Sequence, residues 1–261
     1  NLLENIPSAR LYEEILKLFM SGHALETFTS LRKYNLFKYL FPQMDQLLVQ
    51  IEQDYSHQFI INALKNTDQR INEGDHITPG FLFAVMLWGP MRIMTDEYIS
   101  NSLSEIEAVK LAGDAIISKQ ISSTSIPRRF THMARDIWTL QIRLEQTKKR
   151  TFRVLMHPRF RAAYDFLLLR AKSGECLDNL IDYWTKEQLN EPELAQKLFN
   201  KILNKNLIHP IDLRASFQLY KMNEKNNKSE RHKNHILQNY PNSDYASYLI
   251  NPDFYLKRKA L

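Results

Sequence analysis

The spacing of arginine residues is the feature of this sequence that most clearly indicates a chemical role, which is the binding of anions. Residues 126–172 contain twelve Lys and Arg against three Asp and Glu, a net charge of +9 in a chain whose total is +6. At about 100° per residue, a helix would place four arginines within one arc of about 80°: Arg128, Arg135, Arg143 and Arg150. A row of guanidinium groups offers paired, planar donors of constant charge, which suits a phosphate backbone. Because these arginines are segregated from acidic residues, nucleic-acid binding is favoured over a solvated basic face without a partner.

Apolar residues fall on the opposite side of the same expected helix, so that it can dock on a core while the arginines face outward. They are Phe130, Met133, Ile137, Leu140 and Leu144. Trp138 falls beside the arginine arc, where an exposed indole would stack on unpaired bases. The alternative place for this residue is the core, as we expect for Phe160.

The motifs of catalysis are absent from the sequence. It has no glycine-rich phosphate loop, no His-Glu-x-x-His, no Gly-x-Ser-x-Gly and no Asp-x-Asp pair for two metal ions. His232 and His235 share a helix face, but two ligands alone do not make a zinc site. Cys176 is the single cysteine, so no intrachain disulfide is possible. We therefore expect no catalytic and no metal-binding residue in this chain.

Composition indicates an all-α protein. Only six of 261 residues are glycine, and apolar residues recur at spacings of three and four. The longest apolar run, Phe81–Trp88, is far shorter than the roughly 20 residues of a membrane span. With neither a span nor a signal peptide, we expect no membrane contact and a cytoplasmic protein. The sequence begins at Asn1 without Met and is interpreted as a fragment.

Start and stop signals predict the helices that position these residues. Thr78-Pro79 and Ser104-x-x-Glu107 have the spacing of N-caps, and Pro90 is expected to interrupt a buried apolar helix. Residues 36–41 are expected as a short apolar turn. The expected helices are 7–22, 24–34, 55–72, 79–94, 104–120, the arginine-faced helix that follows, 157–172, 191–204, 211–223 and 228–239.

A change in composition near residue 185 divides the chain. Residues 190–261 contain eleven Asn and only three Arg, so the dense basic character ends before them. We divide the sequence into a helical neck and body over 1–125, an Arg-rich helical segment over 126–184 and a repeat-like C-terminal region over 190–261. The expected fold is an irregular helical bundle followed by a small helical-hairpin or solenoid-like region.

Three segments resemble a known family: residues 2–14, residues 126–130 with 135–138, and residues 157–171. They are similar to the neck and body of bacterial poly(A) polymerases, relatives of the tRNA nucleotidyltransferases, and the likeness spans roughly residues 1–184. The resemblance implies an all-helical part that holds RNA beside a catalytic head. That head carries a Gly-Ser loop and paired aspartates for two magnesium ions. Because this sequence lacks it, ATP and magnesium are expected only with the head, and the chain alone is expected to be inactive.

The same resemblance implies an RNA-contact role for Arg10 and for the basic residues from Arg128 to Arg161. With Trp138 as the stacking candidate, the expected RNA-binding residues are Arg10, Arg128, Arg129, Arg135, Trp138, Arg143, Lys148, Lys149, Arg150, Arg153, Arg159 and Arg161. The expected partner is single-stranded RNA or an RNA 3′ end. The activity implied for the parent enzyme is transfer of AMP from ATP to an RNA 3′-hydroxyl.

The C-terminal region departs from the family. Residues 240–246 resemble the junction between helices in tetratricopeptide-like repeat proteins. We therefore expect that these helices offer a surface for a protein partner. The alternative function is a helical-repeat interaction module whose basic face docks on an acidic partner.

Overall fold

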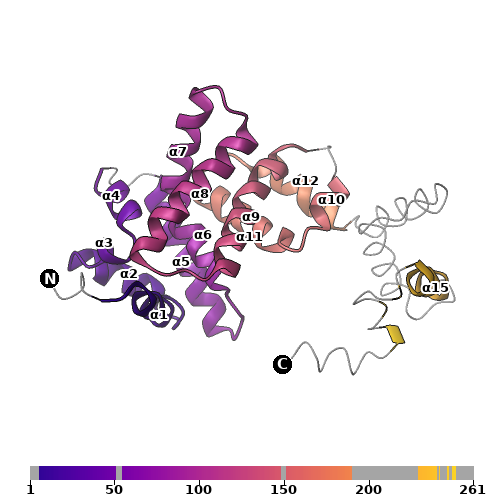
Figure 1. Cartoon of the computed structure of the whole chain (residues 1–261), viewed down its shortest axis with the longest axis horizontal. Helices are drawn as coiled ribbons and strands as arrows, with labels where there is room; N and C mark the ends of the chain where they lie inside the picture. Colours follow the sequence, from indigo (N-terminus) through magenta and orange to yellow (C-terminus); the bar gives the residue numbers. More distant parts are fainter. Residues whose placement is uncertain are drawn as a thin grey trace. The chain divides into compact units, whose positions relative to one another are not determined.

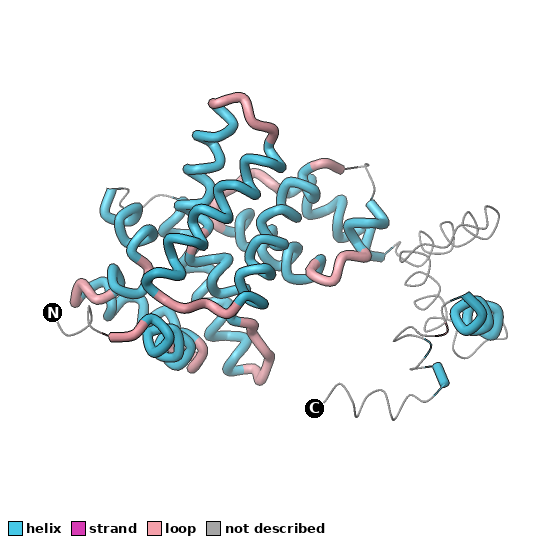
Figure 2. Tube along the Cα trace, viewed as in Figure 1, coloured by secondary structure: helices cyan, strands magenta, loops and turns pink. Residues whose placement is uncertain are grey.

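The computed structural model describes residues 6–50, 55–147, 151–189 and 229–239, and the single positions 241, 246, 249 and 250. Among these residues all regular structure is helical (Figures 1 and 2), which confirms the all-α fold class. The helices are α1 Ser8–Phe19, α2 Ala24–Lys33, α3 Phe37–Leu40, α4 Pro42–Gln50, α5 Tyr55–Asn72, α6 Pro79–Met86, α7 Trp88–Ser100, α8 Glu105–Ser123, α9 Arg128–Glu145, α10 Thr151–Leu155, α11 Phe160–Lys172, α12 Asp178–Leu189 and α15 Ser229–Asn239.

The chain forms two compact units. One comprises Asn1–Thr147 and Pro158–Ile181, and the other comprises Lys148–His157 and Asp182–Leu261. Helices α8 and α9, which lie on either side of residue 125, pack on each other within the first unit. The sequence border drawn at that residue therefore marks a change of composition inside one compact unit.

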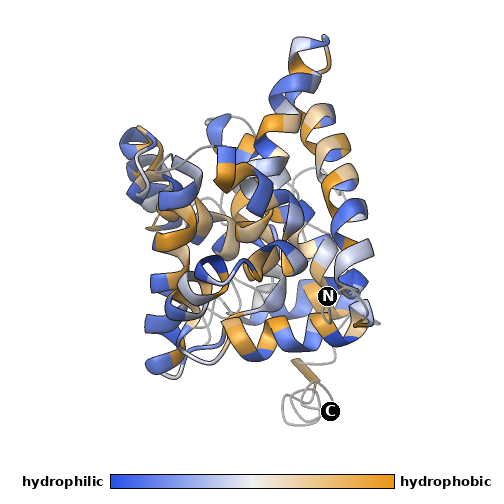
Figure 3. Cartoon of the chain, turned by 90° about the vertical axis from the view of Figure 1, so that its left-hand side faces the viewer, coloured by the Kyte–Doolittle hydropathy of each residue, from blue (hydrophilic) through white to orange (hydrophobic). Residues whose placement is uncertain are grey.

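Helix α9 is central to the first unit, where it packs on α6, α8 and α11. Two glycines allow the close approach, since a Cβ on Gly80 would lie 2.9 Å from Met133 and one on Gly113 would lie 3.1 Å from the Trp138 ring. Met133, Ile137, Leu140 and Leu144 are buried and Phe130 is half-buried, so the predicted apolar face of α9 is confirmed. Hydrophilic and hydrophobic residues alternate along the helices (Figure 3), as expected for amphipathic helices around a shared core.

The arginine-faced helix is shorter than expected. Helix α9 ends at Glu145, and Gln146 leaves the helical conformation with ψ of 64°. Of the four arginines predicted on one helix, α9 carries Arg128, Arg135 and Arg143 and ends before Arg150, which lies outside the described residues.

The apolar stretch after Thr78 is interrupted as predicted, but at another residue. Helix α6 ends at Met86 and α7 begins at Trp88, so the break falls at Leu87. Pro90 is the third residue of α7, where its missing N–H leaves no intrahelical bond unmade. Residues 82–91 are all buried, which confirms this stretch as the centre of the unit. Of the described helices, none combines the length and the apolar character that a membrane span requires.

Both predicted caps occupy the N-cap position, but neither side chain bonds to the helix backbone. The Thr78 hydroxyl donates to the sulfur of Met133 at 3.2 Å, and the Ser104 hydroxyl donates to the Glu107 carboxylate at 2.6 Å. The Thr78 hydroxyl thus joins α6 to α9, and the capping-box residues pair with each other.

Other boundaries agree or differ by a few residues. Residues 36–41, expected as a turn, contain the short helix α3, and the following α4 was not predicted. Helix α11 begins at Phe160, three residues after the expected start. Helix α15 matches the expected 228–239. The expected helices 191–204 and 211–223, and most of the repeat-like junction at 240–246, lie outside the described residues.

Removing a buried side chain of α9 should cost far more stability than removing an exposed one. Ile137 is fully buried, so Ile137→Ala is expected to lower the free energy of unfolding by about 2–5 kcal/mol. Arg143 is exposed on the same helix, and Arg143→Ala should change it by less than about 0.5 kcal/mol. Urea unfolding of both variants checks the difference. Equal effects would contradict the burial of this face.

Candidate nucleic-acid interface

Helix α9 presents arginines on the side away from its buried face. Arg128, Arg129 and Arg143 are exposed, and none of them forms an ion pair with another described residue. Arg135 is held differently, because its Nε donates to the Asp114 carboxylate of α8 at 2.5 Å. Three of these four α9 guanidinium groups are therefore available to an anionic ligand, while the fourth already shares its charge with Asp114.

A hollow of 610 Å³ lies between α8 and α9, beside these arginines. It is lined by Asp114, Ser118, Ile121, Arg128, Thr131, His132 and Arg135. Its two arginines face a single carboxylate, so the hollow is net positive. It therefore suits an extended anionic chain such as a phosphate backbone.

Helix α1 is fixed against the start of α9. The backbone carbonyl of Ser8 accepts from the N–H of Ser125 at 3.1 Å, and the two hydroxyl groups are 2.7 Å apart. The Tyr12 ring stacks on Phe130 with 6.5 Å between ring centroids. Arg10 is exposed two residues before Tyr12. This junction brings the basic residue of the N-terminal segment into the same unit as α9.

Arg129 lies at the same junction. Its guanidinium sits 4.7 Å above the Phe130 ring, and its positive charge reaches Tyr12. Burial raises the pKa of the Tyr12 phenol, and the charge of Arg129 offsets part of that rise. The guanidinium is thus oriented by an aromatic surface and stays exposed.

A second group of arginines lies at the start of α11. Arg159 and Arg161 are exposed, and Arg161 pairs with Asp165, four residues later on the same helix, at 3.2 Å. The same carboxylate also pairs with Arg70 of α5 at 3.2 Å. Arg70 was not singled out from the sequence, because its partner lies 95 residues away.

Trp138 is not available for stacking. Its side chain is fully buried, its Nε1 donates to the Ala84 carbonyl at 3.1 Å, and its ring faces Gly113. The expectation that this indole stacks on a base is therefore wrong. Helix α9 is enclosed by α6 on one side and α8 on the other, so its buried face is wider than its apolar arc.

The remaining expected contact residues lie elsewhere. Lys148, Lys149 and Arg150 are outside the described residues. Arg153 is exposed on α10, which belongs to the second unit. Its contact with RNA therefore stays a prediction, separate from that for the arginines of the first unit.

Two family models match the chain. Residues 1–48 match "Probable RNA and SrmB- binding site of polymerase A", and residues 101–208 match "Polymerase A arginine-rich C-terminus", together more than half of the chain. Poly(A) polymerase I of Salmonella typhi and of Salmonella typhimurium are each 37% identical to it over 205 residues, which cover 77% of this chain. Poly(A) polymerase I of Haemophilus influenzae is 36% identical over 214 residues, or 80% of this chain. The chain belongs to the poly(A) polymerase family. The matches cover 44–46% of these relatives, so the chain spans less than half of their length.

The two segments matched by the poly(A) polymerase models meet in the structure. Ser8 and Tyr12 come from the first matched segment, and Ser125 and Phe130 come from the second. Arg10 of the first segment and Arg128, Arg129 and Arg143 of the second therefore belong to one unit, in which α1 and α9 both pack on α8. Residues 49–100 lie between the matched segments and include α5, α6 and α7.

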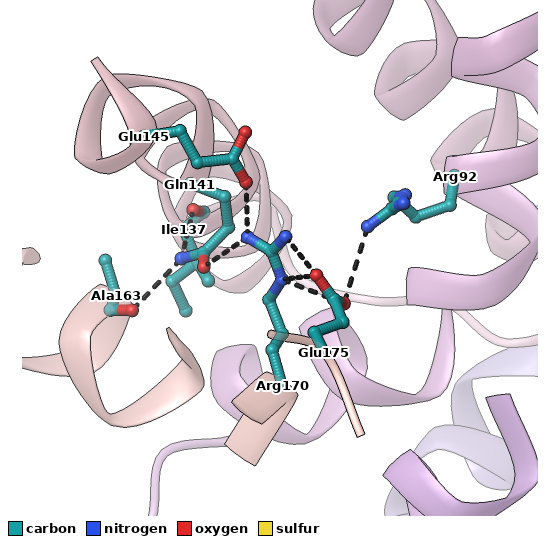
Figure 4. Close-up of polar contacts among 7 residues, drawn as sticks. All are labelled: Arg92, Ile137, Gln141, Glu145, Ala163, Arg170 and Glu175. Atoms are coloured by element: carbon teal, nitrogen blue, oxygen red, sulfur yellow. Dashed lines mark hydrogen bonds and ion pairs between the residues drawn. The ribbon is translucent and has the colours of Figure 1, made fainter. Parts of the chain in front are cut away.

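One arginine of the basic segment is structural. Arg170 is 3% exposed, and Figure 4 shows its guanidinium between Glu175 and Glu145. Its contact to Glu145 of α9 is 2.8 Å, and it also donates to Gln141 at 3.2 Å. The guanidinium lies 5.3 Å from the Trp88 ring of α7. Arg170 therefore joins α7, α9 and α11.

Neighbouring polar groups complete this cluster. Gln141 donates to the carbonyl groups of Ile137 and Ala163 at 3.3 and 3.0 Å, and Arg92 of α7 pairs with Glu175 at 3.5 Å (Figure 4). The burial of Arg170 could have been expected from its spacing, because Phe166 and Leu167 precede it by four and three residues and are fully buried.

The cluster should make folding sensitive to acid. Burial alone would raise the pKa of Glu175, but the hydrogen bonds and charge of Arg170, with the charge of Arg92, hold it below its ordinary value of 4.5. The folded state therefore binds fewer protons at this group than the unfolded state, and the stabilisation is present above pH 4.5. It should be lost as the pH falls below that value through the lowered pKa. Urea unfolding at pH 7 and at about pH 3 should show a larger loss for the wild type than for Glu175→Gln, and equal losses would contradict this assignment.

Proposed function

We propose that this chain is the RNA-binding helical portion of a poly(A) polymerase and that it holds single-stranded RNA, or an RNA 3′ end, through its exposed arginines. The observation that carries the proposal is the row Arg128, Arg129 and Arg143 on α9, which is free of carboxylate partners among the described residues. Arg10 is exposed on α1, which the Ser8–Ser125 contact joins to the segment before α9. Guanidinium groups bind phosphates without reading the base, which suits an enzyme part that must hold any RNA 3′ end.

The chemistry of the parent enzyme is also a proposal. We infer that AMP is transferred from ATP to an RNA 3′-hydroxyl by a catalytic head, where ATP and magnesium ions would act. The residues described here do not fit the metal, because no group of three or more His, Cys, Asp or Glu among them is placed to hold an ion. No step of the transfer is therefore assigned to them.

Two finer points belong to the same proposal. A cytoplasmic location is proposed because the relatives are bacterial enzymes whose name is poly(A) polymerase. A protein partner is proposed for the C-terminal region, of which α15 is described.

Titration of the chain against labelled oligo(A) across a salt series tests the RNA-binding role. Each phosphate neutralised on a single strand contributes a slope of about −0.7, so four engaged arginines predict about −3. The four are Arg10, Arg128, Arg129 and Arg143. Absence of binding at low salt would contradict the proposal. An acidic protein would then be the favoured partner of the basic face.

A further inference from the structure

A second hollow of the first unit lies between α5, α6, α9 and α11. Its volume is 230 Å³. Phe81, Met133 and Ala162 give it an apolar wall, and three arginines give it a cationic rim: Arg70, Arg159 and Arg161. An apolar wall beside several guanidinium groups is the combination that receives a planar ring carrying a phosphate.

Guanidinium groups outnumber carboxylates in the lining of the hollow by three to one. Asp165 is the one carboxylate that lines the hollow, and it is shared by Arg70 and Arg161 at 3.2 Å each. The Nε of Arg70 is buried and makes no hydrogen bond within the described residues, and the Asp75 carboxylate lies 3.7 Å from it.

The apolar wall is held in place by its neighbours. The Phe81 ring meets Phe166 edge-on, with 6.0 Å between the ring centroids. The sulfur of Met133 accepts from the Thr78 hydroxyl at 3.2 Å. A ring that enters the hollow therefore meets an aromatic and a thioether surface that are already ordered, which lowers the entropy cost of binding.

The size of the hollow limits the ligand. Sites for drug-sized molecules usually measure about 300–1,000 Å³, so this one has room for a single nucleotide at most. We propose that it takes one unstacked nucleotide of a single-stranded RNA, with the base against Phe81 and Met133 and the phosphate against the arginine rim. This inference rests on the RNA-binding role proposed above and adds a base-binding position to it.

With this hollow, the proposed RNA-binding surface includes residues outside the two segments that the family models match. Arg70 and Phe81 lie between residues 48 and 101, which neither family model covers. Helix α9 contributes to both hollows, since His132 lines the one beside α8 and its neighbour Met133 lines this one. The two hollows therefore share α9 as a wall.

Two oligomers and two variants test the pocket. The probes are oligo(A) and a ribose-phosphate oligomer of the same length without bases, so that charge is matched. Ala162→Phe fills the hollow, and Ala171→Phe is the control, on the same helix but outside the hollow. Affinities are measured by titration at one salt concentration, after circular dichroism has shown that both variants fold.

The expected result is a selective loss. The wild type should bind oligo(A) more tightly than the baseless oligomer, and Ala162→Phe should weaken oligo(A) about fivefold or more, the size of one base contact. Binding of the baseless oligomer should be unchanged by either variant. An equal loss for both oligomers, or no loss, overturns the pocket and leaves the RNA-binding role standing. If the wild type binds neither oligomer, the RNA-binding role fails first and the pocket fails with it.

A measurement on the wild type alone decides the case where Ala162→Phe does not fold. Oligo(A) that carries a photoreactive adenine is crosslinked to the chain, and the modified peptides are identified by mass spectrometry. Crosslinks in residues 76–81 or 159–165 support the pocket. Crosslinks confined to other peptides overturn it.

Discussion

Replacement of Arg170 by alanine is expected to lower the free energy of unfolding by about 3–5 kcal/mol, because it leaves buried charge without its partner. The guanidinium is 3% exposed and makes contacts with Glu175, Glu145 and Gln141. Without it, the one ion pair that the Glu175 side chain, 19% exposed, keeps with a described residue is the longer contact to Arg92 at 3.5 Å. Urea unfolding measures the loss.

Two further variants separate charge from geometry at this position. Arg170→Lys keeps the charge but loses the paired donors. Its free energy of unfolding should therefore lie between those of Arg170→Ala and the wild type. Arg161→Ala removes a guanidinium from the same helix that is 74% exposed, and it should cost less than about 1 kcal/mol. If Arg170→Ala were as stable as Arg161→Ala, the buried cluster would not hold the three helices together.

Removal of the exposed arginines of α9 is expected to have the largest effect on RNA binding. With Arg128, Arg129 and Arg143 replaced by alanine, the salt slope should shrink by about 2, and the affinity for oligo(A) should fall about 100-fold at 0.1 M salt. Each of these residues is exposed, so the fold should be retained. Titration over the salt series gives both quantities.

A charge-matched variant controls for a diffuse electrostatic effect. Lys33, Lys38 and Lys65 are exposed on α2, α3 and α5, and their joint replacement by alanine removes the same charge. Their loss should weaken oligo(A) binding less than about fivefold, since no phosphate contact is assigned to them. Equal losses in the two triple variants would mean that net charge alone draws the RNA, and that α9 is not the binding face.

Local patterns predicted most of the long described helices, because each is specified by its own residues, but α4 and α12 were not predicted. The apolar face of α9 could be read from spacing, since Ile137, Leu140 and Leu144 recur along one side. The end of α9 could not, because the residues after Glu145 carry no strong stop signal. The exposure of Arg128, Arg129 and Arg143 agrees with the arginine arc and the family likeness, and their contact with RNA stays a prediction.

The failures come from contacts between distant helices. Trp138 lies outside the apolar arc of α9 and is buried all the same, because a projection of one helix does not show that α8 closes its second side. Arg70 and Phe81 join Arg161 at one hollow only after α5, α6 and α11 have packed. The spacing of residues within one segment cannot predict which side chains of different helices come into contact.

The junction of α1 with the start of α9 also sets an order of events during synthesis. Ser8 and Ser125 are 117 residues apart, so at about 5–20 residues per second the ribosome needs roughly 6–23 s to add the second after the first. During that interval Tyr12 has no Phe130 to stack on, and this side of α1 stays open to solvent or to a chaperone. A nascent chain arrested before residue 125 should therefore bind a hydrophobic dye more strongly than one arrested well after α9.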